Sequence, residues 1–316
     1  MQWCVHIAGP QDLDGDATVA RFTSLEGSAR LESAVRLAAG QIVERFGQVR
    51  FTRCAFGNEF CEHLLPAPSA LAAAVEAARA RDLAFTLVTP YVSNEGIRKL
   101  AELLPLLPEG TEVVFNDWGV LNLMLRKFAQ LRPVQGRLLN KSLRDPRVMG
   151  IYGEAPAADG AAAATLAALQ RSNLDNESST ALLSRFGVAA VEMDNLPQGM
   201  DLSFAARLPV AVYLPFGFIS TSRVCMAAGL HYHKADKFQP GAPCRHECQT
   251  HLVEYTYTNS PFTNRDQKFY LKGNTYFYTH SEPMLRSLLD HAASGRVARL
   301  IFQPRLPMTA SVNGVS

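Results

Sequence analysis

Short apolar runs alternate with amphipathic stretches along most of this chain. The apolar runs are rich in β-branched and aromatic residues, a composition that predicts strands. In the first half of the chain they lie at residues 2–8, 49–57, 84–91 and 111–119. The stretches between them predict helices, at residues 28–46, at 69–82, from an N-cap at Asn94 to about 107, and in a last helix that ends at Phe128.

The same alternation continues in the second half after a less regular region. An Ala-rich segment at about 151–175 begins loop-like and ends helix-like, which is typical of an insertion beside the core. The expected strands are a shorter run at 136–140, then 188–195, 208–217 and the C-terminal VARLIFQP, with helices at 178–186 and 282–293. Aromatic alternation in HLVEYTYTN and KFYLKGNTYFYTH predicts an antiparallel ribbon with a turn at Lys272-Gly273-Asn274.

About eight core strands linked by helices predict an α/β fold, with a TIM-like (β/α)8 barrel favoured over a doubly wound sheet. We expect residues 1–316 to form one domain that carries the Ala-rich insertion, a cysteine-bearing loop at about 220–250 and a C-terminal antiparallel β ribbon. With 47% hydrophobic and 19% charged residues, the composition is that of a folded protein rather than a disordered one.

Charge and hydropathy restrict the classes of partner. A net charge of +2 gives little general attraction to nucleic acid, so RNA binding would need a local patch. No apolar run reaches 18 residues, and MQWCVHIAGP lacks the order of an export signal. We therefore expect a cytoplasmic protein without a membrane span, in which thiols stay reduced.

Three of the six cysteines fall in the loop at 220–250, as Cys225, Cys244 and Cys248. The last two form a C-x3-C pair, and the prolines just before them exclude a helix and favour a folded-back loop. Thiolates select zinc or iron-sulfur clusters over hard cations. A site with four ligands needs one more cysteine, for which Cys61 is the candidate and Cys54 its rival.

Spacing alone leaves the occupant open between an iron-sulfur cluster, zinc and no metal. Zinc is supported by four histidines in the same segment, His231, His233, His246 and His251. A disulfide framework is disfavoured, because six cysteines in 316 residues is a low density and no export signal precedes them. Cys4 and Cys54 lie in apolar runs that predict buried strands, where cysteine acts as a small hydrophobe.

Polar groups at the ends of predicted strands are the candidates for chemistry, because a barrel gathers its reactive residues there. Asp117 and Glu192 are candidates for proton handling. Asp117 has a simpler alternative as the cap of the following helix. Arg144 and Arg147, in the loop KSLRDPR, and Arg223, beside Cys225, are candidates for anchoring an anionic substrate. A solvated loop with an internal Arg-Asp pair is the alternative for that loop.

The familiar hydrolytic and nucleotide-binding motifs are absent from the sequence. It contains no G-x-S-x-G, no H-E-x-x-H, no P-loop and no glycine-rich dinucleotide fingerprint. A nicotinamide cofactor is therefore not supported.

Three segments together resemble peptidase family U32. They are Gly57-Asn58-Glu59-Phe60-Cys61 after a strand, Asn116-Asp117-Trp118-Gly119 before a helix, and Ser222-Arg223-Val224-Cys225 followed by the C-x3-C pair. Their cysteine order is similar to the branch of V-type proteins in ubiquinone biosynthesis. The resemblance covers about residues 49 to 250. The opening MQWCVHIAGPQDLDG, the longer loop between Cys225 and Cys244, and GRLLNKSLRDPR depart from it and indicate a separate subfamily.

This resemblance implies a TIM-barrel-like core and an oxygen-sensitive 4Fe-4S cluster on Cys61, Cys225, Cys244 and Cys248. It also implies an oxygen-independent hydroxylation system that acts on a quinone precursor or a similar aromatic or nucleobase substrate, with a homologous partner subunit in a heterodimer. Two alternatives stay open. One is a peptidase or metal-dependent hydrolase, and the other is a non-catalytic iron-sulfur partner subunit.

Overall fold

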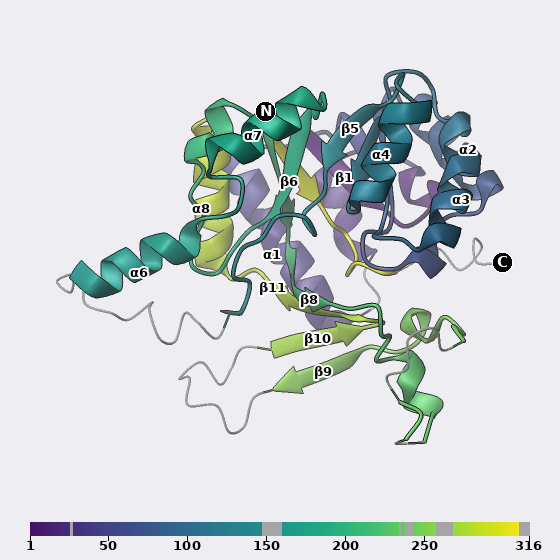
Figure 1. Ribbon diagram of the computed structural model, residues 1–316. Helices are drawn as coiled ribbons and strands as arrows, with labels where there is room; N and C mark the ends of the chain where they lie inside the picture. The colour runs from purple at the N-terminus through teal and green to yellow at the C-terminus, as the bar shows by residue number, and fades with distance from the viewer. Residues whose placement is uncertain (26–27, 147–159, 234, 238–242, 257–267, 310–316) are drawn as a thin grey trace.

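The chain folds around a closed barrel of eight parallel strands (Figure 1). This computed structural model describes residues 1–25, 28–146, 160–233, 235–237, 243–256 and 268–309. The barrel strands are β1 (Gln2–Ile7), β2 (Arg53–Gly57), β3 (Ala84–Val88), β4 (Glu112–Phe115), β5 (Arg132–Gln135), β6 (Ala190–Asp194), β7 (Val210–Leu214) and β12 (Arg299–Phe302). Each strand pairs with the next along the chain, and β12 closes the ring between β7 and β1. The predicted (β/α)8 barrel is confirmed.

Most of the helices surround the barrel, because they have an apolar face to bury against it. In α3, for example, Leu100 and Leu103 are buried while the opposite face carries Glu95 and Arg98. The α-helices are α1 (Ala29–Phe46), α2 (Pro68–Arg79), α3 (Asn94–Leu103), α4 (Trp118–Lys127), α6 (Gly160–Gln170), α7 (Glu177–Arg185) and α8 (Glu282–Ala293). Short 3-10 helices lie at η1 (Pro10–Leu13), η2 (Val19–Ser24), η3 (Glu62–Leu64), η4 (Leu104–Leu106), η6 (Ser203–Ala206), η7 (Ala228–His231) and η8 (Glu247–Gln249).

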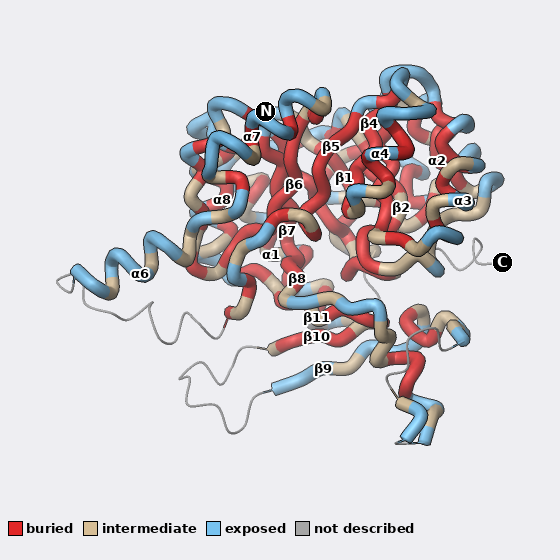
Figure 2. The backbone as a smooth tube through the Cα atoms, in the orientation of Figure 1, coloured by how far each residue is buried: buried red, intermediate tan, exposed pale blue. Residues whose placement is uncertain are grey.

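The amino-terminal end of the barrel interior holds a buried ion-pair layer. Arg299 makes two hydrogen bonds to Glu112, at 2.7 and 3.0 Å, and Arg53 lies 3.2 Å from the same carboxylate. A barrel places its reactive groups at the opposite, carboxyl end, so we assign this layer of ion pairs a structural role. Figure 2 shows that the strands form the most buried part of the molecule.

A second, antiparallel sheet lies at the carboxyl end of the barrel (Figure 1). Its strands are β8 (Phe216–Thr221), β9 (Val253–Thr256), β10 (Lys268–Lys272) and β11 (Thr275–Thr279), in the order β8-β11-β10-β9. The predicted ribbon and its turn are thus confirmed, with a fourth strand that the sequence analysis did not separate. The single strand expected at 208–217 is wrong, since the chain leaves the barrel at Pro215 and enters β8.

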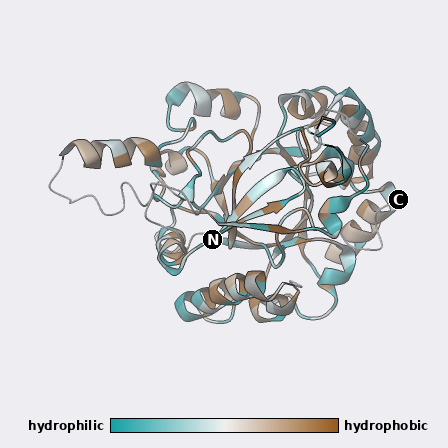
Figure 3. Ribbon diagram, turned by 90° about the horizontal axis from the view of Figure 1, so that it is seen from below, coloured by the Kyte–Doolittle hydropathy of each residue, from teal (hydrophilic) through white to brown (hydrophobic). Residues whose placement is uncertain are grey.

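Three other expectations differ in detail from the structure. The fifth strand is β5 at 132–135, and the apolar run at 136–140 forms turns. Ser93, and not Asn94, is the N-cap of α3. Within the Ala-rich insertion, α6 extends away from the barrel with exposed, hydrophobic residues (Figures 2 and 3), while residues 151–159 lie outside the described residues. None of the helices in the described residues combines the length and hydropathy needed to cross a membrane.

Candidate metal centre

Four cysteines from three parts of the chain line one small cavity beside the second sheet. Cys61 is the N-cap of η3, shortly after β2, and Cys225 follows β8. Cys248 lies in η8, and Cys244 lies in the segment just before it. The cavity measures about 60 Å³. A single water molecule needs only about 10–15 Å³ on the same kind of measure.

The segment Gly57 to Cys61 turns the chain from the end of β2 towards this cavity. Gly57 has a φ of +121°, and a Cβ at this position would lie 2.1 Å from the carbonyl oxygen of Val88, so only glycine fits. The side chain of Asn58 then accepts hydrogen bonds from the backbone N–H groups of Phe60 and Cys61, at 2.8 and 3.1 Å. This Asx turn fixes the backbone that carries the Cys61 thiol.

Hydrogen bonds from N–H groups reach the cysteine sulfurs. The backbone N–H of Ala228 donates to Cys225 Sγ at 3.4 Å, and Gln249 Nε2 donates to Cys248 Sγ at 3.2 Å. Such bonds favour the thiolate over the thiol, and around an iron-sulfur cluster they also adjust its reduction potential. The cavity wall therefore supplies donors to sulfur as well as the sulfurs themselves.

Burial and crowding favour the protonated thiols of Cys61, Cys225 and Cys248 when no cation is present. Burial raises the pKa of Cys61 to about 12, an effect that a hydrogen bond from the His63 backbone opposes and the other three cysteines reinforce. Burial likewise raises the pKa of Cys248 to about 11 and raises that of Cys225. A bound metal centre would reverse this balance, because its positive charge stabilises thiolates. The donor set therefore fits a soft cationic group.

The arrangement of ligands can be compared with the needs of the metals that the sequence left open. Among the described residues, no three Cys, His, Asp or Glu side chains are grouped so that they could hold one metal ion. A 4Fe-4S cluster does not need such a group, because each thiolate binds a different iron. His63 is the histidine that lines the cavity, whereas the four proposed as zinc ligands do not: His231, His233, His246 and His251. The residues present fit a cluster better than a single zinc ion.

The other two cysteines lie elsewhere. Cys4 and Cys54 are buried in β1 and β2, and neither lines the cavity. Arg223, proposed for substrate binding, does line it. Its guanidinium lies 5.6 Å from the ring centroid of Tyr91 and donates to the carbonyl of Val92 at 3.4 Å. It is thus positioned beside the cysteines.

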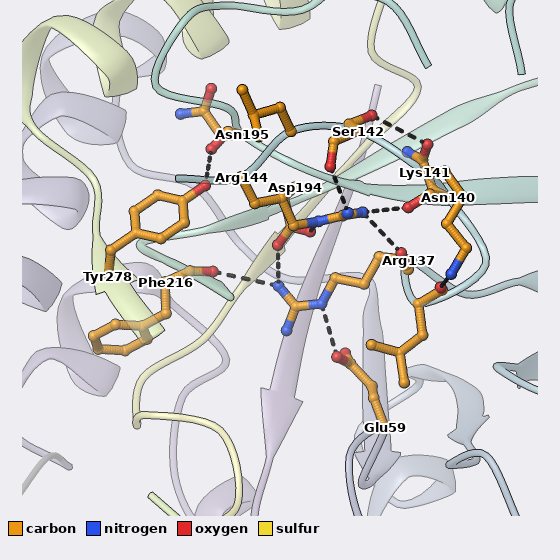
Figure 4. A network of polar contacts seen from close by, with 12 residues as sticks. Glu59, Arg137, Asn140, Lys141, Ser142, Arg144, Asp194, Asn195, Phe216 and Tyr278 are labelled. Atoms are coloured by element: carbon orange, nitrogen blue, oxygen red, sulfur yellow. Dashed lines mark hydrogen bonds and ion pairs between the residues drawn. The ribbon is translucent and has the colours of Figure 1, made fainter. Parts of the chain in front are cut away.

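A second cluster of polar residues fills the carboxyl end of the barrel (Figure 4). Arg137 donates to Glu59 at 2.7 Å and to Asp194 at 2.8 Å, and all three side chains are almost fully buried. The guanidinium also lies 3.9 Å from the ring centroid of Tyr213. Arg137 and Glu59 were not predicted as a pair from the sequence, although each is a charged residue within two positions of a strand end.

Arg144 belongs to the same cluster and not to an open site. It is 8% exposed and donates to Asp194 at 2.8 Å and to the carbonyl of Asn140 at 2.5 Å (Figure 4). With two arginines and two carboxylates, the cluster is electrically balanced. These contacts give Arg144 a structural position and leave its proposed substrate role without support. Arg147 lies outside the described residues.

The two proposed proton-handling residues have separate positions. Asp117 is the N-cap of α4 and accepts from the N–H of Gly119 at 2.6 Å, as in the alternative interpretation of the sequence. Glu192 is buried inside the barrel, where Tyr213 donates to it at 2.7 Å. Burial, reinforced by the nearby charge of Glu59, raises the pKa of Glu192 to about 8. Neither residue lines the cysteine cavity.

A larger pocket of about 720 Å³ adjoins the cysteine cavity. Its walls come from the ends of β1 and β2, from the segment between Glu62 and α2, and from α3. His63 and Leu64 line both spaces, so they form a shared wall. A pocket of this volume at the carboxyl end of a barrel is typical of a small-molecule site.

Comparison with known proteins gives no identity. No family model matches the chain, and no curated protein matches it. Among solved structures, the chain aligns with the U32 peptidase Mk0906 at 9% identity and a TM-score of 0.38, covering 96% of this chain and 92% of that one. It also aligns with a class V chitinase mutant from Cycas revoluta at 10% identity and a TM-score of 0.35, covering 96% and 94% of the two chains. A glycoside hydrolase family 18 N-acetylglucosaminidase from Paenibacillus barengoltzii gives 11% identity, a TM-score of 0.29 and coverage of 80% and 88%. Likenesses this weak assign neither a family nor an activity.

Proposed function

We propose that this chain is an iron-sulfur protein similar to family U32, in which Cys61, Cys225, Cys244 and Cys248 hold one 4Fe-4S cluster. The observation that carries the proposal is that these four thiols, widely separated in the sequence, line one cavity. The hydrogen bonds to the sulfurs of Cys225 and Cys248 support the same conclusion, because they favour thiolates. A bound cluster supplies one-electron redox chemistry.

We further propose that the protein takes part in an oxygen-independent hydroxylation system. This part rests on the sequence resemblance, which implies a quinone precursor or a similar aromatic or nucleobase substrate and a homologous partner subunit. The pocket beside the cysteine cavity supports it, because a substrate there would lie next to the redox centre. In this account His63 and Leu64 separate the substrate from the cluster.

The second candidate function is a non-catalytic iron-sulfur partner subunit. The sealed cluster of Arg137, Glu59 and Asp194 favours it, because the place where barrels usually react with substrates is filled by ion pairs. The two functions differ in what the pocket does. Filling the pocket abolishes turnover by the reconstituted system if this chain is catalytic and leaves it unchanged if the chain is a partner.

Cysteine variants test the cluster directly. Each of Cys61, Cys225, Cys244 and Cys248 is replaced by Ser, and the protein is purified without oxygen. We expect the broad visible absorbance of an iron-sulfur cluster, and the bound iron, to fall strongly in each variant. Cys4→Ser and Cys54→Ser are the matched controls and keep both signals, because these residues lie in the barrel strands. Retention of iron by all four variants would reject the ligand set.

A further inference from the structure

Both hydrogen-bond donors and apolar side chains line the pocket next to the cysteine cavity. Apolar contacts come from Phe56, Leu64 and Leu103, among others. The donors include Asn58 and the amino-terminal end of α2, and Gln11, His63, His246 and Thr309 also line the pocket. We propose that this pocket binds a small apolar molecule through a carboxylate that Asn58 and the start of α2 hold. The identification of this molecule as the substrate rests on the proposed function.

Asn58 is placed to donate a hydrogen bond into the pocket. It is 8% exposed, and its Oδ1 is occupied by the backbone N–H groups of Phe60 and Cys61. This occupation fixes the amide orientation, so Nδ2 is the free end. Among the described residues, none accepts a hydrogen bond from Nδ2. This atom is also absent from the fully buried polar atoms that have no partner, so it is accessible. Because Asn58 lines the pocket, Nδ2 is the donor available to a bound molecule.

The start of α2 adds positive potential to the pocket. Ala67, Pro68 and Ser69 line the pocket, and they are the N-cap and the first residues of this helix. No side chain caps α2, and its first turn contains no acidic residue. Its unpaired N–H groups and its dipole therefore favour an anionic oxygen at this position.

The charges around the pocket select a carboxylate over a phosphate. Among the described residues that line the pocket, Lys99 is the one lysine or arginine. Its side chain is exposed and lies 3.8 Å from the carboxylate of Glu95. Glu62 and Glu102 also line the pocket. A dianionic phosphate usually requires several arginines or lysines, and two acidic residues would repel it. A singly charged carboxylate needs fewer donors and suffers less repulsion.

The carboxylate of Glu62 is hydrogen-bonded at the start of α3. Its Oε2 accepts from both the backbone N–H and the hydroxyl of Ser93, each at 2.8 Å, at the start of α3. Glu62 therefore neutralises the amino terminus of α3, while that of α2 is left for a ligand.

Matched pairs of acids and amides test this inference. The probes are phenylacetate with phenylacetamide and hexanoate with hexanamide, and binding is measured by calorimetry and by saturation-transfer NMR. We expect each acid to bind at least about tenfold more tightly than its amide. Equal binding within both pairs, or no binding of either acid, would overturn the proposal.

Three variants locate the binding site. Ala73→Trp fills the pocket and abolishes binding, whereas Ala72→Trp, at an exposed neighbouring position on α2 that does not line the pocket, leaves binding unchanged. Asn58→Asp keeps the oxygen that accepts from Phe60 and Cys61 but replaces the donor, so it weakens acid binding at least about tenfold and leaves amide binding intact. Equal binding by the Ala73 and Ala72 variants would place the ligand elsewhere and reject the site.

The binding measurement and the iron measurement fail independently. Protein that lacks iron but prefers acids would reject the proposed function and keep this inference. Protein that holds iron but binds acids and amides equally would support the proposed function and reject this inference.

Discussion

Asn274 donates a hydrogen bond from Nδ2 to the carbonyl oxygen of Phe60 at 2.7 Å. The same amide donates to the carbonyl of Ser222 at 2.6 Å. Phe60 directly precedes Cys61, and Ser222 lies three residues before Cys225. A single buried side chain in the β10–β11 turn therefore connects the segment that carries Cys61 with the segment that carries Cys225. The second sheet acts as the frame on which the cysteine cavity is assembled.

Asn274→Ala removes this connection. The buried carbonyl of Phe60 loses its donor, and a buried unpaired group costs about 1–3 kcal/mol. The carbonyl of Ser222 still accepts from the hydroxyl of Tyr91 at 2.6 Å. We expect a fall of about 2 kcal/mol in the free energy of unfolding and a loss of bound iron after anaerobic purification. Denaturant titration and iron analysis measure the two effects.

The control for Asn274→Ala is Asn176→Ala. Asn176 caps α7 through the N–H of Ser179, at 2.7 Å, and does not line the cysteine cavity. Its loss costs about 1 kcal/mol, but iron binding should persist. Equal iron loss in both variants would mean that stability alone, and not the tether, governs the centre.

Gly57→Ala places a methyl group against the β3 backbone. The Cβ would lie 2.1 Å from the carbonyl oxygen of Val88, and the φ of +121° is unfavourable for alanine. We expect strong destabilisation and loss of iron, because the turn that leads to Cys61 cannot form. Gly40→Ala in α1 is the control, since a Cβ there meets nothing within 4 Å and alanine favours the helix by about 1 kcal/mol. Thermal melting should move in opposite directions for the two variants.

Arg137→Met tests the buried ion-pair cluster. The substitution leaves the carboxylate of Glu59 buried without its arginine, whereas Asp194 keeps Arg144. Removing one partner of a buried ion pair typically costs about 3–5 kcal/mol. Arg36→Met is the control, because the Arg36–Glu32 pair in α1 is exposed and of an i,i+4 type that contributes about 0.3–0.5 kcal/mol. Chemical denaturation should show a large loss for the first variant and almost none for the second. Similar small losses would mean that the carboxylates find other partners.

Glu192→Gln should make the protein more stable at neutral pH. Burial raises the pKa of Glu192 to about 8, against an ordinary value of 4.5. Between these values the unfolded chain has released the proton and the folded chain retains it, so wild-type stability falls as pH rises through this window. The variant does not titrate, and its amide oxygen can still accept from Tyr213.

The stability difference between this variant and the wild type should therefore grow from about pH 5 to about pH 8, by on the order of 1 kcal/mol per pH unit, and then level off. Urea titrations at a series of pH values measure it. A difference that does not change with pH would show that Glu192 is ionised in the folded protein.

Most of the barrel could be predicted from the sequence, because parallel strands buried on both faces read as continuous apolar runs. The two failures both involve proline. Pro133 interrupts the short β5, so the neighbouring run at 136–140 looked more like a strand. Pro215 divides an apolar run whose two halves belong to different sheets, and local hydropathy cannot reveal that division.

The candidate site was predictable where chemistry is local and unpredictable where it depends on packing. The cysteine pattern selected Cys61 in preference to Cys54, and the structure places it with the other three. The alternation of side chains along β2 could have excluded Cys54, since it is buried on the helix-facing side of the strand. Arg144 looked available because its loop is polar, and only the fold brings Asp194 to neutralise it.

Iron, acid-labile sulfide and zinc per chain, measured on protein purified without oxygen, test the central claim most directly. Four thiolates on one 4Fe-4S cluster require about four irons and four sulfides per chain, with little zinc and a brown colour that air bleaches. A colourless protein with one zinc per chain and no sulfide would contradict the account.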